Sequence, residues 1–169
     1  MNLQEITDAA IAPAMCLLPP AMDTMQARVM LLAIGQQESR FEYRRQLGNG
    51  PARGFWQFEL GTAQSRGGVW GVFLHPASGN LLRTIAKQRG WELPAPTSIY
   101  RAIEHDDVLA AVTARLLLWT DSQPLPNLGD VNGAWELYAK RCWRPGKPHR
   151  ETWDGFYTQA LDFVKKAAA

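Results

Sequence analysis

Long apolar runs, cysteine and strand-like patterns are all scarce in this sequence. No apolar stretch reaches the roughly 18 residues of a membrane-spanning helix, so we expect no stable membrane insertion. The two cysteines, Cys16 and Cys142, are too few for a disulfide framework, and whether they pair with each other stays open. Alternation of apolar and polar residues never persists over about five positions, which leaves little support for strands.

Motifs for cofactors, metals and nucleic acids are missing too. There is no phosphate-binding glycine loop, no dinucleotide fingerprint and no nucleophile elbow. The three histidines, His75, His105 and His149, lie far apart, so we expect no metal and no cofactor. Lys and Arg total 18 against 16 Asp and Glu, a net charge of +2 without clustered basic runs, and this predicts no nucleic-acid partner.

What is present fits an ordinary globular protein. The chain has 169 residues, of which 46% are hydrophobic and 20% charged, enough to bury a core. No repeat or long linker divides it, so we expect one domain over 1–169 and a monomer. The N-terminal residues are acidic and prolines interrupt the only apolar candidate after them, so no signal peptide is expected.

Helical periodicity dominates and predicts an all-α fold. One helix should start after residues 23–24 and end near 37–39; its middle, 29–34, is apolar on every face, which is typical of a buried central helix. A second buried helix is expected over 106–120. Residues 42–58 hold Gly and Pro without a regular period, which predicts an irregular segment or a small β-hairpin. The remaining helices are expected over 3–17, 60–66, 78–89, 98–103, 130–142 and 151–166.

The candidate for chemistry lies where the central helix ends. Glu38 follows an entirely apolar helix, and the negative end of the helix dipole together with partial desolvation would raise the pKa of its carboxyl group. A general acid that works near neutral pH needs that upward shift. The alternative is a helix-terminal glutamate that faces water, and neighbouring arginines would lower its pKa if they came close.

Three short segments in order carry a family resemblance. Residues 38–41 read Glu-Ser-Arg-Phe, residues 54–58 read Gly-Phe-Trp-Gln-Phe, and residues 62–63 read Thr-Ala. This set resembles the Glu-Ser-x-Phe, Gly-x-x-Gln and Thr-Ala signatures of soluble lytic transglycosylases, which share the lysozyme-like fold with goose-type lysozymes. The resemblance implies a lysozyme-like domain that acts on peptidoglycan glycan strands.

The resemblance also implies roles for the matched residues. Glu38 would protonate the oxygen between N-acetylmuramic acid and N-acetylglucosamine. It would then draw a proton from the muramoyl 6-hydroxyl, which closes a 1,6-anhydro ring without water. Ser39 and Gln57 would bind the glycan by hydrogen bonds, and Trp56 and Phe58 would line the cleft. Trp119 and Trp153 are expected to be packing residues.

One later segment departs from the family pattern. The family places Ala-Tyr-Asn-x-Gly there, with the tyrosine bonded to the catalytic glutamate, whereas residues 133–138 read Gly-Ala-Trp-Glu-Leu-Tyr. Trp135 stands at the expected place and Tyr138 lies one helical turn further, on nearly the same face. Either Tyr138 makes the hydroxyl contact or the contact is absent. The open alternative for Tyr138 is a core residue.

The number of carboxylates bears on the type of reaction. A conventional glycosidase needs two carboxyl groups, roughly 5–9 Å apart, whereas the transglycosylase reaction needs one. Glu42 and Glu59 are the nearest other acids in sequence, and Asp106 and Asp107 could be brought across by the fold. We expect a single catalytic carboxylate, Glu38.

The leading hypothesis from the sequence is therefore a peptidoglycan lytic transglycosylase. The alternatives are a hydrolytic lysozyme (endolysin), or a non-catalytic virion or wall-binding module of the same fold. The residues around Cys142 and the chain generally resemble phage-encoded wall-degrading proteins. Such a protein would be made in the bacterial cytoplasm and would reach the periplasm through a holin or inside the virion.

Overall fold

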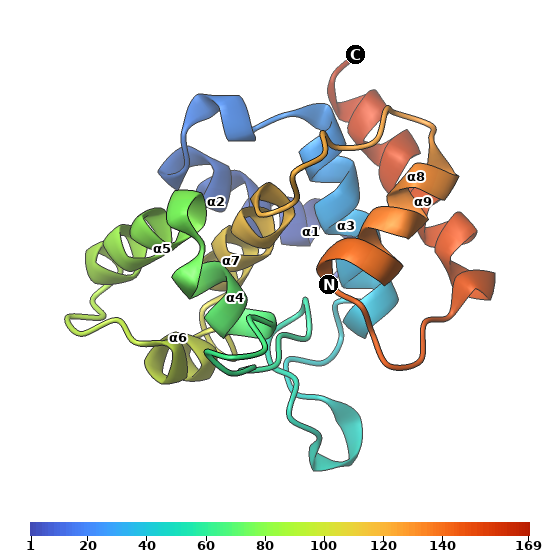
Figure 1. The fold of residues 1–169 in the computed structure, drawn as a ribbon. Coiled ribbons are helices and arrows are strands. Elements are labelled where there is room, and N and C mark those ends of the chain that lie inside the picture. Colours follow the sequence, from blue (N-terminus) through green and yellow to red (C-terminus); the bar gives the residue numbers. More distant parts are fainter.

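The computed structural model describes all residues 1–169, and helices account for nearly all of its regular structure (Figure 1). None of these helices is both long and apolar enough to cross a bilayer. The α-helices are α1 (Leu3–Ile6), α2 (Ala12–Leu17), α3 (Met25–Ser39), α4 (Gly68–Leu74), α5 (Pro76–Gln88), α6 (Pro96–Ala102), α7 (Asp107–Trp119), α8 (Val131–Glu136) and α9 (Arg150–Ala167). Two π-helical segments, η1 (Thr7–Ile11) and η4 (Leu137–Cys142), and two 3-10 turns, η2 (Pro20–Met22) and η3 (Leu47–Asn49), complete them.

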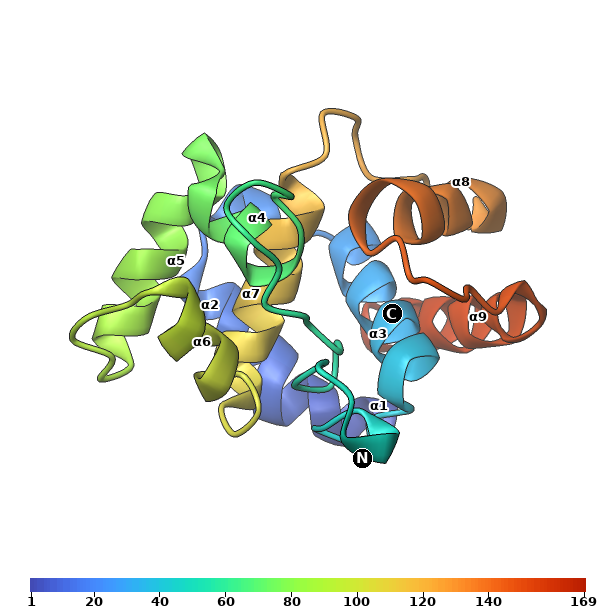
Figure 2. The same cartoon turned by 60° about the horizontal axis from the view of Figure 1, so that its bottom comes forward.

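The all-α prediction is confirmed, and α3 is the central helix. Its N-terminus is capped by Thr24, whose hydroxyl accepts a hydrogen bond from the Ala27 N–H at 3.1 Å. The residues 29–34 are all buried, as expected for a helix that is apolar on every face. Figures 1 and 2 show α3 between α7 and α9, and α3 packs on both of them.

The first predicted helix, 3–17, is present but changes its hydrogen-bond register midway. Pro13 has no N–H to donate, so the regular α-helical bond cannot form there. The Ala12 N–H bonds to the Thr7 carbonyl, five residues back, and the π-helical turn η1 separates α1 from α2. A π-bulge of this kind absorbs the proline without ending the helix.

The predicted helix over 60–66 is wrong. Residues 63–66 form a turn, and α4 begins at Gly68. The glycines here permit close backbone approach instead of breaking helices: a Cβ on Gly68 would lie 2.1 Å from the Glu59 carbonyl oxygen. A Cβ on Gly71 would lie 2.3 Å from the Arg66 carbonyl oxygen.

Residues 42–58 form an irregular loop whose middle part projects from the helical body, while its end, 54–58, is mostly buried (Figure 1). The loop contains no strand, and its only ladder pairs are isolated antiparallel bridges from Arg53 to Arg45 and to Phe58. Two salt bridges connect the loop to the start of α7 and the residues just before it: Arg44 pairs with Asp107 at 2.7 Å, and Arg53 pairs with Glu104 at 2.9 Å. Of the two predicted forms, the irregular segment is the observed one.

Two helical glycines should respond oppositely to substitution by alanine. A Cβ on Gly35, inside α3, would lie 2.1 Å from the buried Phe41 ring, which itself packs edge-on against Phe55 and Trp56. Gly35→Ala should therefore destabilise the fold by about 1–3 kcal/mol. Gly155, on the exposed side of α9, has open space around it, so Gly155→Ala should stabilise by about 0.5–1 kcal/mol. Urea unfolding of both variants measures the two signs; a neutral Gly35→Ala would contradict the packing described here.

Candidate active site

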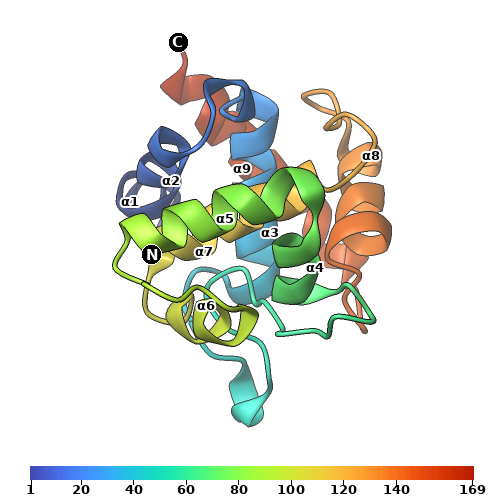
Figure 3. The same ribbon diagram turned by 60° about the vertical axis from the view of Figure 1, so that its left-hand side comes forward.

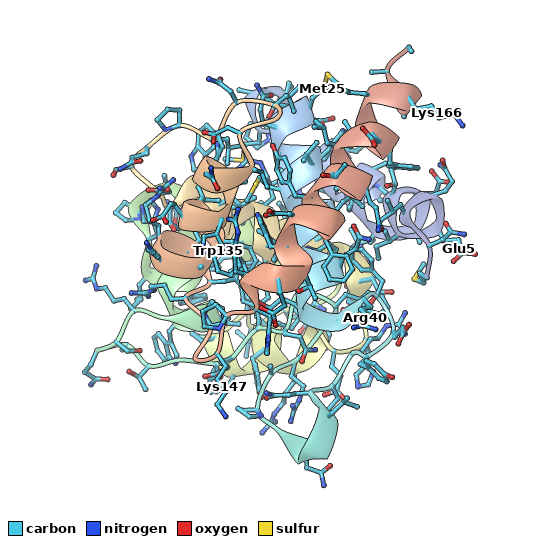
Figure 4. The ribbon with its side chains drawn as sticks, turned by 90° about the vertical axis from the view of Figure 1, so that its right-hand side faces the viewer. Glu5, Met25, Arg40, Trp135, Lys147 and Lys166 are labelled. Carbon is cyan, nitrogen blue, oxygen red and sulfur yellow. The ribbon has the colours of Figure 1, made fainter.

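Glu38 lies in the last turn of α3, where the helix ends in left-handed backbone. Arg40 (φ 53°) is the C-cap of α3, and its N–H bonds to the Gln36 carbonyl at 3.1 Å. Figure 4 shows Arg40 at this end of α3, close to α9. The partly buried Glu38 accepts a hydrogen bond on Oε1 from the Tyr138 hydroxyl, at 2.9 Å and across 100 residues of chain. Of the two sequence alternatives, the hydroxyl contact is the one that the structure contains.

The surroundings of Glu38 favour its protonated form. Burial is the largest effect and raises the pKa of Glu38 from 4.5 to about 7; the negative charge of Glu59 raises it as well, while the hydrogen bond from Tyr138 lowers it. A carboxyl group with this pKa exists in both protonation states near neutral pH. It can donate a proton to a leaving oxygen and then accept one, as a general acid–base catalyst must.

Tyr138 is held in place by an aromatic cluster on η4, α8 and α9. Its ring stacks on the Trp153 ring, with centroids 4.9 Å apart and planes 7° from parallel. Trp153 is fully buried, as the packing prediction had it, and donates its indole N–H to the Val131 carbonyl at 3.3 Å. Burial and the neighbouring Glu38 charge raise the pKa of Tyr138. The hydroxyl therefore keeps its proton and serves as a donor.

Trp135 belongs to the same cluster but does not bond to Glu38. Its ring packs 5.7 Å from both Tyr138 and Trp153, and the Arg150 guanidinium lies over it at 5.3 Å. Figure 4 shows Trp135 on α8, beside α9. Trp135 thus packs against the ring of Tyr138, which lies one helical turn further along the chain.

The 54–58 segment packs between α3 and η4. The Ser39 hydroxyl donates to the Phe55 carbonyl at 2.7 Å, and the Trp56 indole donates to the Leu31 carbonyl at 2.9 Å. From the other side, the Trp143 indole donates to the Trp56 carbonyl at 3.0 Å. These bonds fix the segment next to the end of α3.

The structure corrects the expected positions of Ser39, Trp56 and Phe58. Ser39 is 5% exposed, and its hydroxyl is already occupied by the Phe55 carbonyl and the Phe41 N–H. Trp56 and Phe58 are 0% and 2% exposed, so neither offers a ring face to a sugar. Each aromatic is more favourable inside the junction, where it removes large apolar area from water and the indole N–H finds a partner. The three side chains are therefore buried packing residues next to Glu38 in the fold, not groups that face a ligand.

Gln57 is the member of the segment that stays accessible. Its backbone is left-handed (φ 48°), and its Nε2 donates to the Gly54 carbonyl at 2.8 Å. The amide oxygen makes no hydrogen bond within the chain and can accept one from a ligand. Gln57 therefore stays a candidate substrate-binding residue.

The other acids considered in the sequence lie in different settings. Asp106 and Asp107 each carry a guanidinium partner, Arg89 at 2.6 Å and Arg44 at 2.7 Å. Glu59, by contrast, lies close enough to Glu38 for its charge to raise the pKa of that residue. Among the named candidates, Glu59 is the one whose charge acts on the pKa of Glu38.

Other residues depart from expectation or were missed. Trp119, expected to be a packing residue, is 41% exposed, because it lies in the last turn of α7 with Arg115 over its ring. Trp143, which the sequence did not single out, donates to the 54–58 segment; its position just before a Pro-Gly segment gave no periodic signal.

No group of three or more His, Cys, Asp or Glu side chains is placed to hold a metal ion. Cys16 and Cys142 are both free.

Comparisons of the chain with protein-family models, with curated proteins and with solved structures find no match. The geometry of the site and the sequence pattern are therefore what bears on function.

The raised pKa of Glu38 makes the stability of the protein depend on pH. Between pH 4.5 and about 7 the folded state binds more protons than the unfolded state, so stability falls as pH rises through this window. Glu38→Gln removes this loss. Between about pH 4 and pH 8, the free energy of unfolding should fall in the wild type relative to Glu38→Gln by up to about 3 kcal/mol. Urea unfolding across this range measures it.

A matched control separates this effect from general titration. Glu42 is an exposed residue four positions after Glu38, and Glu42→Gln should keep the wild-type pH dependence. If wild type and Glu38→Gln have parallel pH profiles, the pKa of Glu38 is not raised.

Proposed function

We propose that the protein cleaves the glycan strand of peptidoglycan as a lytic transglycosylase, with Glu38 as general acid and then general base. One observation carries the proposal: a partly buried carboxyl group with a pKa of about 7, bonded to a tyrosine hydroxyl, beside the segment that resembles the family's Gly-x-x-Gln motif. The family resemblance supplies the substrate, and the carboxyl group supplies the chemistry.

The reaction uses the two protonation states of one carboxyl group. Protonated Glu38 gives its proton to the glycosidic oxygen as the bond to C1 of the muramoyl residue breaks. The carboxylate then accepts the proton of the muramoyl 6-hydroxyl, and that oxygen bonds to C1. The product carries a 1,6-anhydro ring, and Glu38 regains its proton. Tyr138 orients Glu38 and stabilises its ionised form between the two steps.

Loss of the acid should abolish cleavage without loss of the fold. Glu38→Gln should lower the rate of glycan release from purified peptidoglycan by at least about 10²-fold, since general acid–base catalysis contributes 10²–10⁴-fold. Circular dichroism and the thermal midpoint of the variant check that it is folded. Glu42→Gln, which changes an exposed carboxylate of the same region, should cleave at the wild-type rate. Wild-type clearance by Glu38→Gln would refute the proposed role.

Glu59 favours one alternative, a hydrolase that uses two carboxylates. The charge of Glu59 raises the pKa of Glu38. In a hydrolase, a second carboxylate positions water or stabilises the sugar cation. The masses of the released muropeptides separate the reactions, because the anhydro product is about 18 Da lighter than the hydrolysed one. We expect the lighter product. Binding to insoluble peptidoglycan without any soluble release would instead identify a wall-binding module.

A Glu59→Gln variant tests the same point kinetically. Without the Glu59 charge the pKa of Glu38 falls, so activity should decline with rising pH at a lower pH than in the wild type, while the maximal rate is largely retained. The pH profile of kcat measures this shift. A loss comparable to that of Glu38→Gln would assign Glu59 a direct catalytic role and support hydrolysis.

A further inference from the structure

A polar pocket lies next to the C-terminal end of η4, the helical segment that also carries Tyr138. It occupies about 200 Å³ between α4, the C-terminal end of α7 and the end of η4. Figures 1 and 3 show α4 on one side of this region and the orange turns after α8 on the other. The polar side chains that line it are Arg66, His75, Thr120, Arg141, Cys142 and Arg144.

The charge of this pocket is positive and only partly compensated. Arg141 pairs with Asp121 at 2.7 Å, whereas Arg66 and Arg144 have no carboxylate partner. No Asp or Glu lines the pocket. His75 adds a buried Nδ1 without a hydrogen-bond partner, and buried polar atoms in proteins rarely lack one. Two unpaired guanidinium groups and an unsatisfied ring nitrogen around one cavity suit an oxyanion.

The pocket is connected to the site of Glu38 through Tyr138. The Tyr138 carbonyl accepts hydrogen bonds from the N–H groups of Trp143 and Arg144, both at 3.1 Å, while its hydroxyl donates to Glu38. Cys142 follows Tyr138 by about one turn of helix. The residue that bonds to the acid and the residues that line the pocket thus belong to one short stretch of chain, 138–144.

We propose that this pocket binds a carboxylate carried by the same substrate strand that Glu38 cleaves. The proposal rests on the proposed function, since in peptidoglycan the muramoyl residues bear peptides that end in carboxylates. Arginine suits this role because its planar guanidinium donates two parallel hydrogen bonds to a carboxylate. The pocket then selects strands that carry peptides over bare glycan.

A double variant, Arg66→Gln with Arg144→Gln, tests this on two substrates. Both residues are exposed and form no salt bridge, so the fold should be retained. On strands with intact peptides we expect KM to rise about tenfold, with kcat nearly unchanged, from the loss of charge-assisted hydrogen bonds. On strands freed of their peptides by an amidase, the variant should match the wild type. Arg101→Gln, an exposed and unpaired arginine on α6, is the control and should change neither value.

Equal effects on both substrates, or no effect on either, would overturn the proposal. A binding experiment keeps the test independent of turnover: acetate or inorganic phosphate is titrated into the wild type and the double variant at constant ionic strength, with the amide signals of 142–144 followed by NMR. Acetate should shift these signals in the wild type alone. If only phosphate binds, or neither, the pocket does not hold a carboxylate. If the wild type cleaves neither substrate, the proposed function fails, while acetate binding still decides whether the pocket takes a carboxylate.

Discussion

The hydrogen bond between the Tyr138 hydroxyl and the Glu38 carboxyl group joins two segments that are far apart in the sequence. It connects the last turn of α3 to the π-helical segment η4, across 100 residues of chain. Its strength depends on exclusion of water, and the same exclusion raises the pKa of the carboxyl group to about 7. Burial and the tyrosine act in opposite directions on that pKa. The pKa of Glu38 is therefore set by two opposing effects: burial favours the protonated form, and the hydrogen bond from Tyr138 favours the ionised form.

The aromatic residues supply this dry environment. Trp153 stacks on Tyr138 from α9, and Trp143 donates to the 54–58 segment from the end of η4. The helix α9 is itself bonded to α3 near the acid, through Gln36 to Gln159 at 2.9 Å and through Thr152 to Gln37 at 3.1 Å. Tryptophan contributes here through its buried area and its N–H donor, and not as an exposed platform for sugar. The same helices that bury the core also set the position of the acid.

Charge is distributed unevenly around this centre. Most arginines near Glu38 in sequence form salt bridges with other carboxylates: Arg44 pairs with Asp107, and Arg45 and Arg53 pair with Glu104. These pairs keep guanidinium groups away from Glu38, where they would have lowered its pKa. The unpaired guanidinium groups of Arg66 and Arg144 lie instead around the pocket beyond Tyr138. The carboxyl group with the raised pKa and the basic pocket thus lie at one short stretch of chain, 138–144.

Local signals determined much of this protein. The apolar run at 29–34 and the start signal at residues 23–24 predicted α3 and its burial, and a buried helix was expected over 106–120, where α7 lies. Helix periodicity and caps act over a few residues, so the sequence shows them directly. The position of Glu38 at the end of a buried helix likewise indicated its raised pKa. The tertiary structure alone decided the contacts over long sequence separations. Tyr138, and not Trp135, bonds to Glu38, and the charge of Glu59 raises the pKa of Glu38. The side chain of Trp56 is buried in the core. The helix predicted over 60–66 was wrong for the same reason, since the close backbone approach of Gly68 to residue 59 and of Gly71 to residue 66 leaves no mark in the local pattern.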